Sequence, residues 1–181
     1  MSKKKQIILG VTASIAIYKS CEIIRCLQDA DFSVEVILTP EAKELIRPIV
    51  FGSLTGNKVY CEMFEEGSSW EIEHVALADK AALVLIAPAT ANIIAKMASG
   101  ICDDLLTCVV MATRAPVLIC PAMNENMFLN KITQANIKKL ESLGYSFVKP
   151  KVGKLACGKT GVGCLAEVEN ILKEAKRLVS L

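Results

Sequence analysis

The chain has 181 residues, a net charge of +2 and a hydrophobic fraction of 52%. Its length favours one domain with a sizeable core, and no apolar run approaches the roughly 18 residues that span a bilayer. The low net charge and the 5% share of aromatic residues argue against a nucleic-acid-binding protein. The start, Met-Ser-Lys-Lys-Lys, lacks the features of a signal peptide, so we expect a cytoplasmic protein.

Strands and helices are predicted to alternate along the chain. In chain order, the pattern predicts a strand at Gln6–Val11, a helix from Thr12 to about Asp29, a strand at Ser33–Leu38, a helix near Pro40–Ile46, and an irregular stretch from about Phe51 to Glu73 with one short strand at Lys58–Cys61. There follow a strand at Ala81–Ile86, helices at Ala91–Ala98 and Asp104–Ala112, a strand at Pro116–Cys120, a helix at Thr133–Leu143, a strand at Tyr145–Val148, a glycine-rich loop and a closing helix at Glu167–Leu178. This order predicts a single-domain α/β fold, a three-layer, Rossmann-like, doubly wound parallel sheet.

The eight cysteines indicate neither a disulfide scaffold nor a zinc site. Most lie inside apolar periodic segments, no CxxC pair occurs, and the chain has a single histidine. We therefore expect no bound metal, and we expect most of the cysteines to be reduced and buried as small hydrophobic residues. Cys157 is the exception, because it lies in the glycine-rich loop.

Short polar side chains follow several predicted strands, at the edge of the sheet where ligands of open α/β folds bind. Ser14 and Thr39 follow the first two strands, and Thr90 and Asn92 follow Ala81–Ile86. A helix N-terminus at such a point suits a phosphate, but the GxGxxG fingerprint is absent and NAD is not supported. Helix capping explains Ser14 and Thr90 about equally well.

Asn124 follows the strand that Pro121 is expected to end. Its uncharged amide could hold a carboxylate by hydrogen bonds without placing a second charge beside it. It could also simply cap the turn that follows.

Two further segments could carry proton chemistry. His74 is the only histidine, and imidazole suits proton transfer near neutral pH, although a lone histidine is more often structural. Four glycines lie within residues 153–163, around Cys157. This density suggests a mobile flap near residues 153–165 whose thiol could deliver a proton, or an ordinary loop with an unreactive cysteine.

Together these segments resemble the flavin-containing cysteine decarboxylases, over nearly the whole chain from Gly10 to about Glu167. The run 121–127 (Pro-Ala-Met-Asn-Glu-Asn-Met) matches the family's PxMNxxM motif, and 155–158 (Leu-Ala-Cys-Gly) matches its flap. His74 falls where the family keeps its catalytic histidine. The runs 87–92 and 100–107 match as well.

The resemblance implies a bound FMN and a role for each candidate residue. Cofactor contacts would come from Ala13, Ser14, Ile15, Thr39, Thr90, Ala91, Asn92 and Ala122. Substrate contacts would come from Met123, Asn124 and Ala156, with Asn124 holding the cysteinyl carboxylate. His74 and Cys157 would be the catalytic residues.

The implied reaction is the decarboxylation of 4′-phosphopantothenoylcysteine to 4′-phosphopantetheine in coenzyme A biosynthesis. Flavin would oxidise the cysteinyl β-carbon to a thioaldehyde, CO2 would leave, and the ene-thiol would be reduced again with a proton from Cys157. FMN would supply the electron chemistry while the protein orients and protonates.

The resemblance also implies a homotrimer or homododecamer with active sites between subunits, His74 coming from one and Asn124 from its neighbour. No fused ligase domain is expected within these 181 residues, so a separate phosphopantothenoylcysteine synthetase would be needed.

Two alternatives remain open within this resemblance. A peptidyl-cysteine oxidative decarboxylase would omit the reductive half and would not need Cys157. A non-catalytic flavin-binding relative would typically lack one of the three groups His74, Asn124 and Cys157. A flavin prenyltransferase shares the general fold but does not suit the Met-Asn pair or the cysteine flap. The chain departs from the family's usual residues at Ala13, Ile93, Phe128 and Lys159.

Overall fold

A central parallel sheet organises the computed structural model, which describes residues 4–63, 73–156 and 158–180. The strands of the protein are β1 (Gln6–Val11), β2 (Ser33–Leu38), β3 (Val59–Tyr60), β4 (Leu83–Ala89), β5 (Val117–Pro121), β6 (Ser146–Phe147), β7 (Lys151–Lys154) and β8 (Thr160–Cys164). Its helices are the 3-10 helix η1 (Ile15–Tyr18), α1 (Lys19–Asp29), α2 (Pro40–Lys43), α3 (Pro48–Thr55), α4 (Glu73–Lys80), α5 (Ala91–Ser99), α6 (Leu105–Ala112), α7 (Glu125–Leu129), α8 (Lys131–Ser142) and α9 (Val168–Val179).

Six strands form the central sheet in the order β3-β2-β1-β4-β5-β6, and each neighbouring pair is parallel. The order reverses between β1 and β4, which is the point where ligands of doubly wound sheets bind. Thr12, just after β1, joins the two strand ends: its buried hydroxyl donates to the Pro88 carbonyl at 2.8 Å and accepts the Thr90 N–H at 3.1 Å. The predicted Rossmann-like topology is confirmed.

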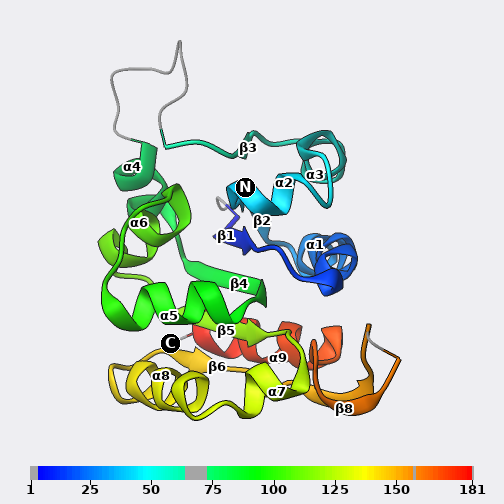
Figure 1. Ribbon diagram of the computed structural model, residues 1–181. Helices are drawn as coiled ribbons and strands as arrows, with labels where there is room; N and C mark the ends of the chain where they lie inside the picture. The colour runs from blue at the N-terminus through cyan, green and yellow to red at the C-terminus, as the bar shows by residue number, and fades with distance from the viewer. Residues whose placement is uncertain (1–3, 64–72, 157, 181) are drawn as a thin grey trace.

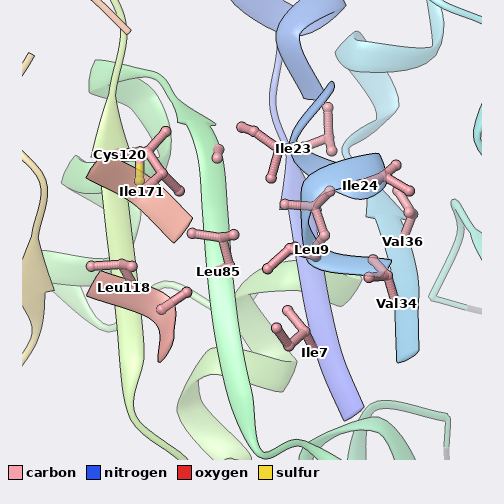
Figure 2. Packing of buried hydrophobic residues seen from close by; sticks show 14 of the residues in the cluster. Ile7, Leu9, Ile23, Ile24, Val34, Val36, Leu85, Leu118, Cys120 and Ile171 are labelled. Atoms are coloured by element: carbon pink, nitrogen blue, oxygen red, sulfur yellow. The ribbon is translucent and has the colours of Figure 1, made fainter. Parts of the chain in front are cut away.

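Alternate residues of each strand pack into two hydrophobic cores, one on each face of the sheet. Leu9 and Leu85 belong to the core beneath α1 and α9, whereas Ile8 belongs to the core beneath α5 and α6. Figure 2 shows the face of the sheet that α1 and α9 cover, with Ile171 of α9 near β5. Burying a side chain of this size contributes roughly 1.5–3 kcal/mol to the free energy of folding. Strands that are covered on both faces therefore carry apolar residues at successive positions, which appear in the sequence as continuous apolar runs. Figure 1 shows the helices on either side of the sheet, which confirms the three layers.

The structure differs from the prediction between the second and third long strands. Residues 48–55 form a helix, although the pattern predicts an irregular stretch from about Phe51; Pro48 lies in its first turn, and Gly56 ends it in the left-handed conformation. Phe51 in this helix is fully buried. Residues 73–80 form α4, a further helix that the sequence pattern did not predict.

The glycine-rich segment is also more regular than predicted. β7 and β8 pair as an antiparallel hairpin that stands apart from the central sheet. Where the two strands of the hairpin are joined, the Leu155 N–H donates to the Lys159 carbonyl at 2.8 Å. The expected flap is therefore a hairpin over its described residues, while the thiol of Cys157 lies outside them.

The cysteines correct one expectation. The seven within the described ranges are free, as predicted, but only Cys120 is fully buried, and Cys102 is exposed. Burial raises the pKa of the Cys120 thiol far above its usual range, so this group stays neutral. Within the described ranges, no helix is both long and apolar enough to cross a membrane.

Candidate functional site

A cavity of about 560 Å³ opens at the point where the strand order reverses. Three segments that each follow a strand contribute to its lining: Ala13, Ser14 and Ile15 after β1, Thr90 and Ala91 after β4, and Ala122, Met123 and Asn124 at the end of β5. Neighbouring parallel strands end at the same edge of a sheet, which is why these distant segments meet. The cavity has the size and position of a cofactor site.

Three of these residues cap the helices that begin beside the cavity. The Asn124 Oδ1 accepts the Asn126 N–H at 2.9 Å, and the Thr90 Oγ1 accepts the Ile93 N–H at 3.3 Å. The Ser14 Oγ accepts the Ala16 N–H at 3.4 Å. The capping interpretation was therefore correct, and it does not compete with a binding role, because the same residues line the cavity. Capping fixes the orientation of each side chain.

The hairpin supplies a further wall of the cavity. Gly153, Leu155 and Ala156 line it from the β7 side, and Gly163, Cys164 and Leu165 line it from the β8 side. The predicted substrate residue Ala156 thus lies in the same cavity as Met123 and Asn124. This wall comes from residues 153–156 and 163–165, far along the chain from the end of β5 at Pro121, and no local sequence pattern relates the two segments.

Lysines give the cavity a positive character. Lys19, Lys151 and Lys154 all line it. The Lys151 ammonium pairs with the Glu167 carboxylate, and that hydrogen bond raises the pKa of Lys151. Cations beside an apolar cavity suit a ligand that carries both a flat apolar body and an anionic group.

Four predicted site residues do not contribute to the described lining. Thr39 lies at the expected edge, where its N–H donates to the Val11 carbonyl at 3.1 Å, but it does not reach the cavity. Asn92 is exposed in the first turn of α5. His74 lies in the first turn of α4, and Figure 1 shows α4 and β8 at opposite corners of the molecule. Cys157 lies outside the described residues.

Sequence reasoning missed several residues that line the cavity. Tyr18 and the three lysines were not singled out, nor were Met127 and Cys164. Lys151 and Lys154 lie beside or in the glycine-rich segment and Lys19 follows the Ser14 turn, so a count of charges near both segments could have found them. The position of Cys164 depends on the pairing of β7 with β8, whereas the glycine-rich pattern predicts a loop.

Comparisons with known proteins agree with this geometry. The model of the family described as Flavoprotein matches residues 1–180. The chain is 42% identical over 177 residues to the coenzyme A biosynthesis bifunctional protein CoaBC of Bacillus subtilis, covering 98% of this chain but 44% of that protein. It is 40% identical over 172 residues to a probable phosphopantothenoylcysteine decarboxylase of Streptococcus mutans, covering 94% of this chain and 96% of that protein.

Solved structures show the same fold. A PPC decarboxylase variant complexed with pantothenoylaminoethenethiol superposes with a TM-score of 0.88 at 27% identity, covering 99% of this chain and all of that one. The FMN-dependent cysteine decarboxylase SpaF superposes with a TM-score of 0.85 at 28% identity, covering 97% of both chains. The single-domain, doubly wound architecture is therefore shared with both.

Proposed function

Because the chain belongs to the flavoprotein family, whose model matches residues 1–180, we propose that it decarboxylates 4′-phosphopantothenoylcysteine to 4′-phosphopantetheine with the help of FMN. The observation that carries this proposal is the convergence of Asn124, Met123 and Ala156 on one cavity at the switch point of the sheet. These residues come from the two motifs that are most specific to the cysteine decarboxylases. The relative from Streptococcus mutans, which has about the same length, supports the same activity.

The cavity suits FMN on its own chemistry. Ala13, Ala91 and Ala122 line it with side chains no larger than a methyl group, so a flat ring system can approach the backbone closely. Ser14 and Thr90 add hydroxyl groups at two helix starts, where a phosphate is favoured. FMN, when bound, would supply the oxidation of the cysteinyl group and the later return of the electrons.

The protein's own residues would bind, orient and protonate the substrate. Asn124 would hold the carboxylate that is lost, and its cap on α7 fixes the amide before the substrate arrives. Met123 and Ala156 would form the walls beside the reacting group. Cys157 would donate a proton to the ene-thiol, which also takes back the two electrons as a hydride from FMN, so that the net reaction is a decarboxylation and not an oxidation.

The lysines favour a phosphorylated substrate over a peptide. Phosphopantothenoylcysteine carries a phosphate at the end remote from the reacting carboxylate. Lys19 and Lys154 line the cavity without an ion pair to any described residue, so their ammonium groups can meet a dianion there. A peptidyl cysteine carries no such charge, which favours the coenzyme A reaction.

His74 requires a second copy of the chain if it is to act at this cavity. It belongs to α4, whereas the cavity lies between the strand ends and the β7–β8 hairpin. We therefore place His74 in the site of a neighbouring subunit, within a homotrimer or a homododecamer. A phosphopantothenoylcysteine synthetase would supply the substrate, and the cytoplasm is the expected compartment.

Replacing Cys157 with serine tests the proposed reductive half. Because serine is a much weaker acid than cysteine, Cys157→Ser should release CO2 once per bound flavin and leave the ene-thiol. Mass spectrometry distinguishes the ene-thiol from 4′-phosphopantetheine by two hydrogen masses. Cys102→Ser, which changes an exposed cysteine away from the cavity, is the control and should behave as the wild type. Unimpaired 4′-phosphopantetheine formation by Cys157→Ser would remove the assigned role.

A further inference from the structure

The hairpin wall of the cavity is held against the Asn124 segment at two points. At the first, the Met123 N–H donates to the Gly163 carbonyl at 3.0 Å. The two backbones approach so closely that a Cβ on Gly163, whose φ is +137°, would lie 2.2 Å from the Met123 carbonyl oxygen. Only glycine fits this contact, which joins β8 to the end of β5.

The second point is a side chain, Glu125. Its Oε1 accepts the backbone N–H of Val162 at 3.0 Å. A Cβ on Gly161 would lie 2.5 Å from that same oxygen and 2.7 Å from Oε2, so the carboxylate occupies the space that this glycine leaves open. Figure 1 shows α7, which begins with Glu125, beside β8. The carboxylate therefore holds the middle of β8 against the start of α7, and we call this contact between Glu125 and β8 the clasp.

We propose that Glu125 is a positioning residue that sets the distance between the hairpin wall and the substrate-binding amide of Asn124. The two residues are adjacent, and α7 starts between them, so one short helical turn carries both the amide and the clasp. A hydrogen bond to a carboxylate is stronger than one between neutral groups, which suits a contact that must hold a strand against the body of the protein. The consequence for catalysis rests on the proposed decarboxylation; the clasp itself does not.

Hydrogen exchange tests the clasp without relying on activity. In Glu125→Ala, amides in peptides covering residues 158–164 should exchange about tenfold faster, because the Val162 N–H loses its acceptor. Glu125→Gln keeps an oxygen at this position and should restore most of the protection. Glu141→Ala, on the exposed face of α8, is the matched control and should leave exchange in these peptides unchanged.

A glycine variant tests the same contact from the side of β8. The Cβ of Gly161→Ala would push aside only the end of a flexible side chain, so the fold should survive while the carboxylate is displaced. Gly161→Ala should therefore raise exchange as Glu125→Ala does. Exchange in the double variant should be no faster than in either single variant, because both substitutions remove the same contact. Independent, additive effects would overturn the assignment.

Kinetics then separate positioning from general destabilisation. Glu125→Ala should raise KM for 4′-phosphopantothenoylcysteine by about tenfold with kcat changed much less, and Glu125→Gln should recover most of this loss. FMN content should stay as in the wild type, because the proposed cofactor contacts lie on the strand-end walls. Unchanged exchange in Glu125→Ala, or an unchanged KM in an active enzyme whose exchange has risen, would contradict the proposal. An inactive wild type with an intact clasp would instead count against the proposed function alone.

Discussion

Asn124, Ser14 and Thr90 each use a side-chain oxygen to accept a backbone N–H at a helix start, and each also lines the cavity. A cap restrains the side chain in the free protein, so a ligand that binds there does not have to order it. The two roles can be separated experimentally where a substitution preserves the cap and changes the charge.

Asn124→Asp is such a substitution. Aspartate caps a helix about as well as asparagine, so α7, the fold and the FMN content should be preserved. The new carboxylate would stand beside the carboxylate of the substrate, and turnover should fall by on the order of 100-fold or more. Steady-state rates of CO2 release measure this, with thermal unfolding as the check on the fold. Near-normal turnover in Asn124→Asp would show that the residue only caps its helix.

Most of the candidate residues that line the cavity share one property. They lie within a few residues of the end of a strand, so a buried apolar run is enough to place them at the rim, as with Ser14, Thr90 and Asn124. Glu125 was not predicted, because its role depends on a partner far along the chain. The Val162 N–H that Glu125 binds lies 37 residues away, and no periodic pattern encodes that pairing.

At the scale of elements, charged side chains tie α4 to the edge of the sheet. Lys58 pairs with Glu73 at 2.5 Å and Lys80 with Glu35 at 2.6 Å, and both ammonium groups face the ring of Tyr60. Burial, together with the charge of the nearby Glu35 carboxylate, raises the pKa of Tyr60 to about 12. This arrangement holds the helix that carries His74.

The raised pKa predicts a change in stability at alkaline pH. Tyr60 ionises near pH 10 in the unfolded chain but near 12 in the folded protein, so from pH 10 upwards the folded state binds more protons and loses stability as pH rises. The free energy of unfolding of the wild type minus that of Tyr60→Phe should be constant below pH 10 and should fall between about pH 10 and 12. Urea denaturation at a series of pH values measures it. Parallel curves would mean that the Tyr60 hydroxyl titrates normally.

Most elements were predictable, including the short strands β3 and β6, whereas the helices α3, α4 and α7 were not. β1 and β2 have the predicted bounds, because strands buried on both faces read as unbroken apolar runs. The sequence of α3 contains β-branched residues and a glycine, which are weak helix formers, and burial of Phe51 overrides that preference. α7 has five residues, too few to show helical periodicity.

At the scale of the whole molecule, the position of His74 makes assembly part of the proposed site. The cavity gathers Asn124 and the hairpin wall in one chain, while α4 lies at another corner (Figure 1). Exposed apolar residues occur near α4 as well, with Val75 on α4 and Met111 on the adjacent α6. A neighbouring copy would cover such residues and bring its own His74 to the cavity.

Mixing two inactive variants tests this arrangement. His74→Ala and Asn124→Asp should each abolish most turnover, since both residues would be needed at every site. When equal amounts are assembled together, roughly a quarter of the sites should combine an intact His74 with an intact Asn124, and activity should return in that proportion. Turnover of the unfractionated mixture provides the measurement, and capture through two different affinity tags shows that the two variants have assembled together. If the mixture is no more active than the two separate variants, then either both residues act in a site formed by one subunit or one of them has no role in turnover.

The central claim is that the net reaction is a decarboxylation in which the flavin ends unchanged. The most direct test is turnover in oxygen-free buffer, with FMN-loaded wild-type protein, 4′-phosphopantothenoylcysteine in excess and no added electron acceptor. We predict many molecules of CO2 per flavin, an equal amount of 4′-phosphopantetheine, and an oxidised flavin spectrum at the end. If the reaction stops after one CO2 per flavin, with the flavin reduced and an ene-thiol as product, the chain is an oxidative decarboxylase and the account is wrong.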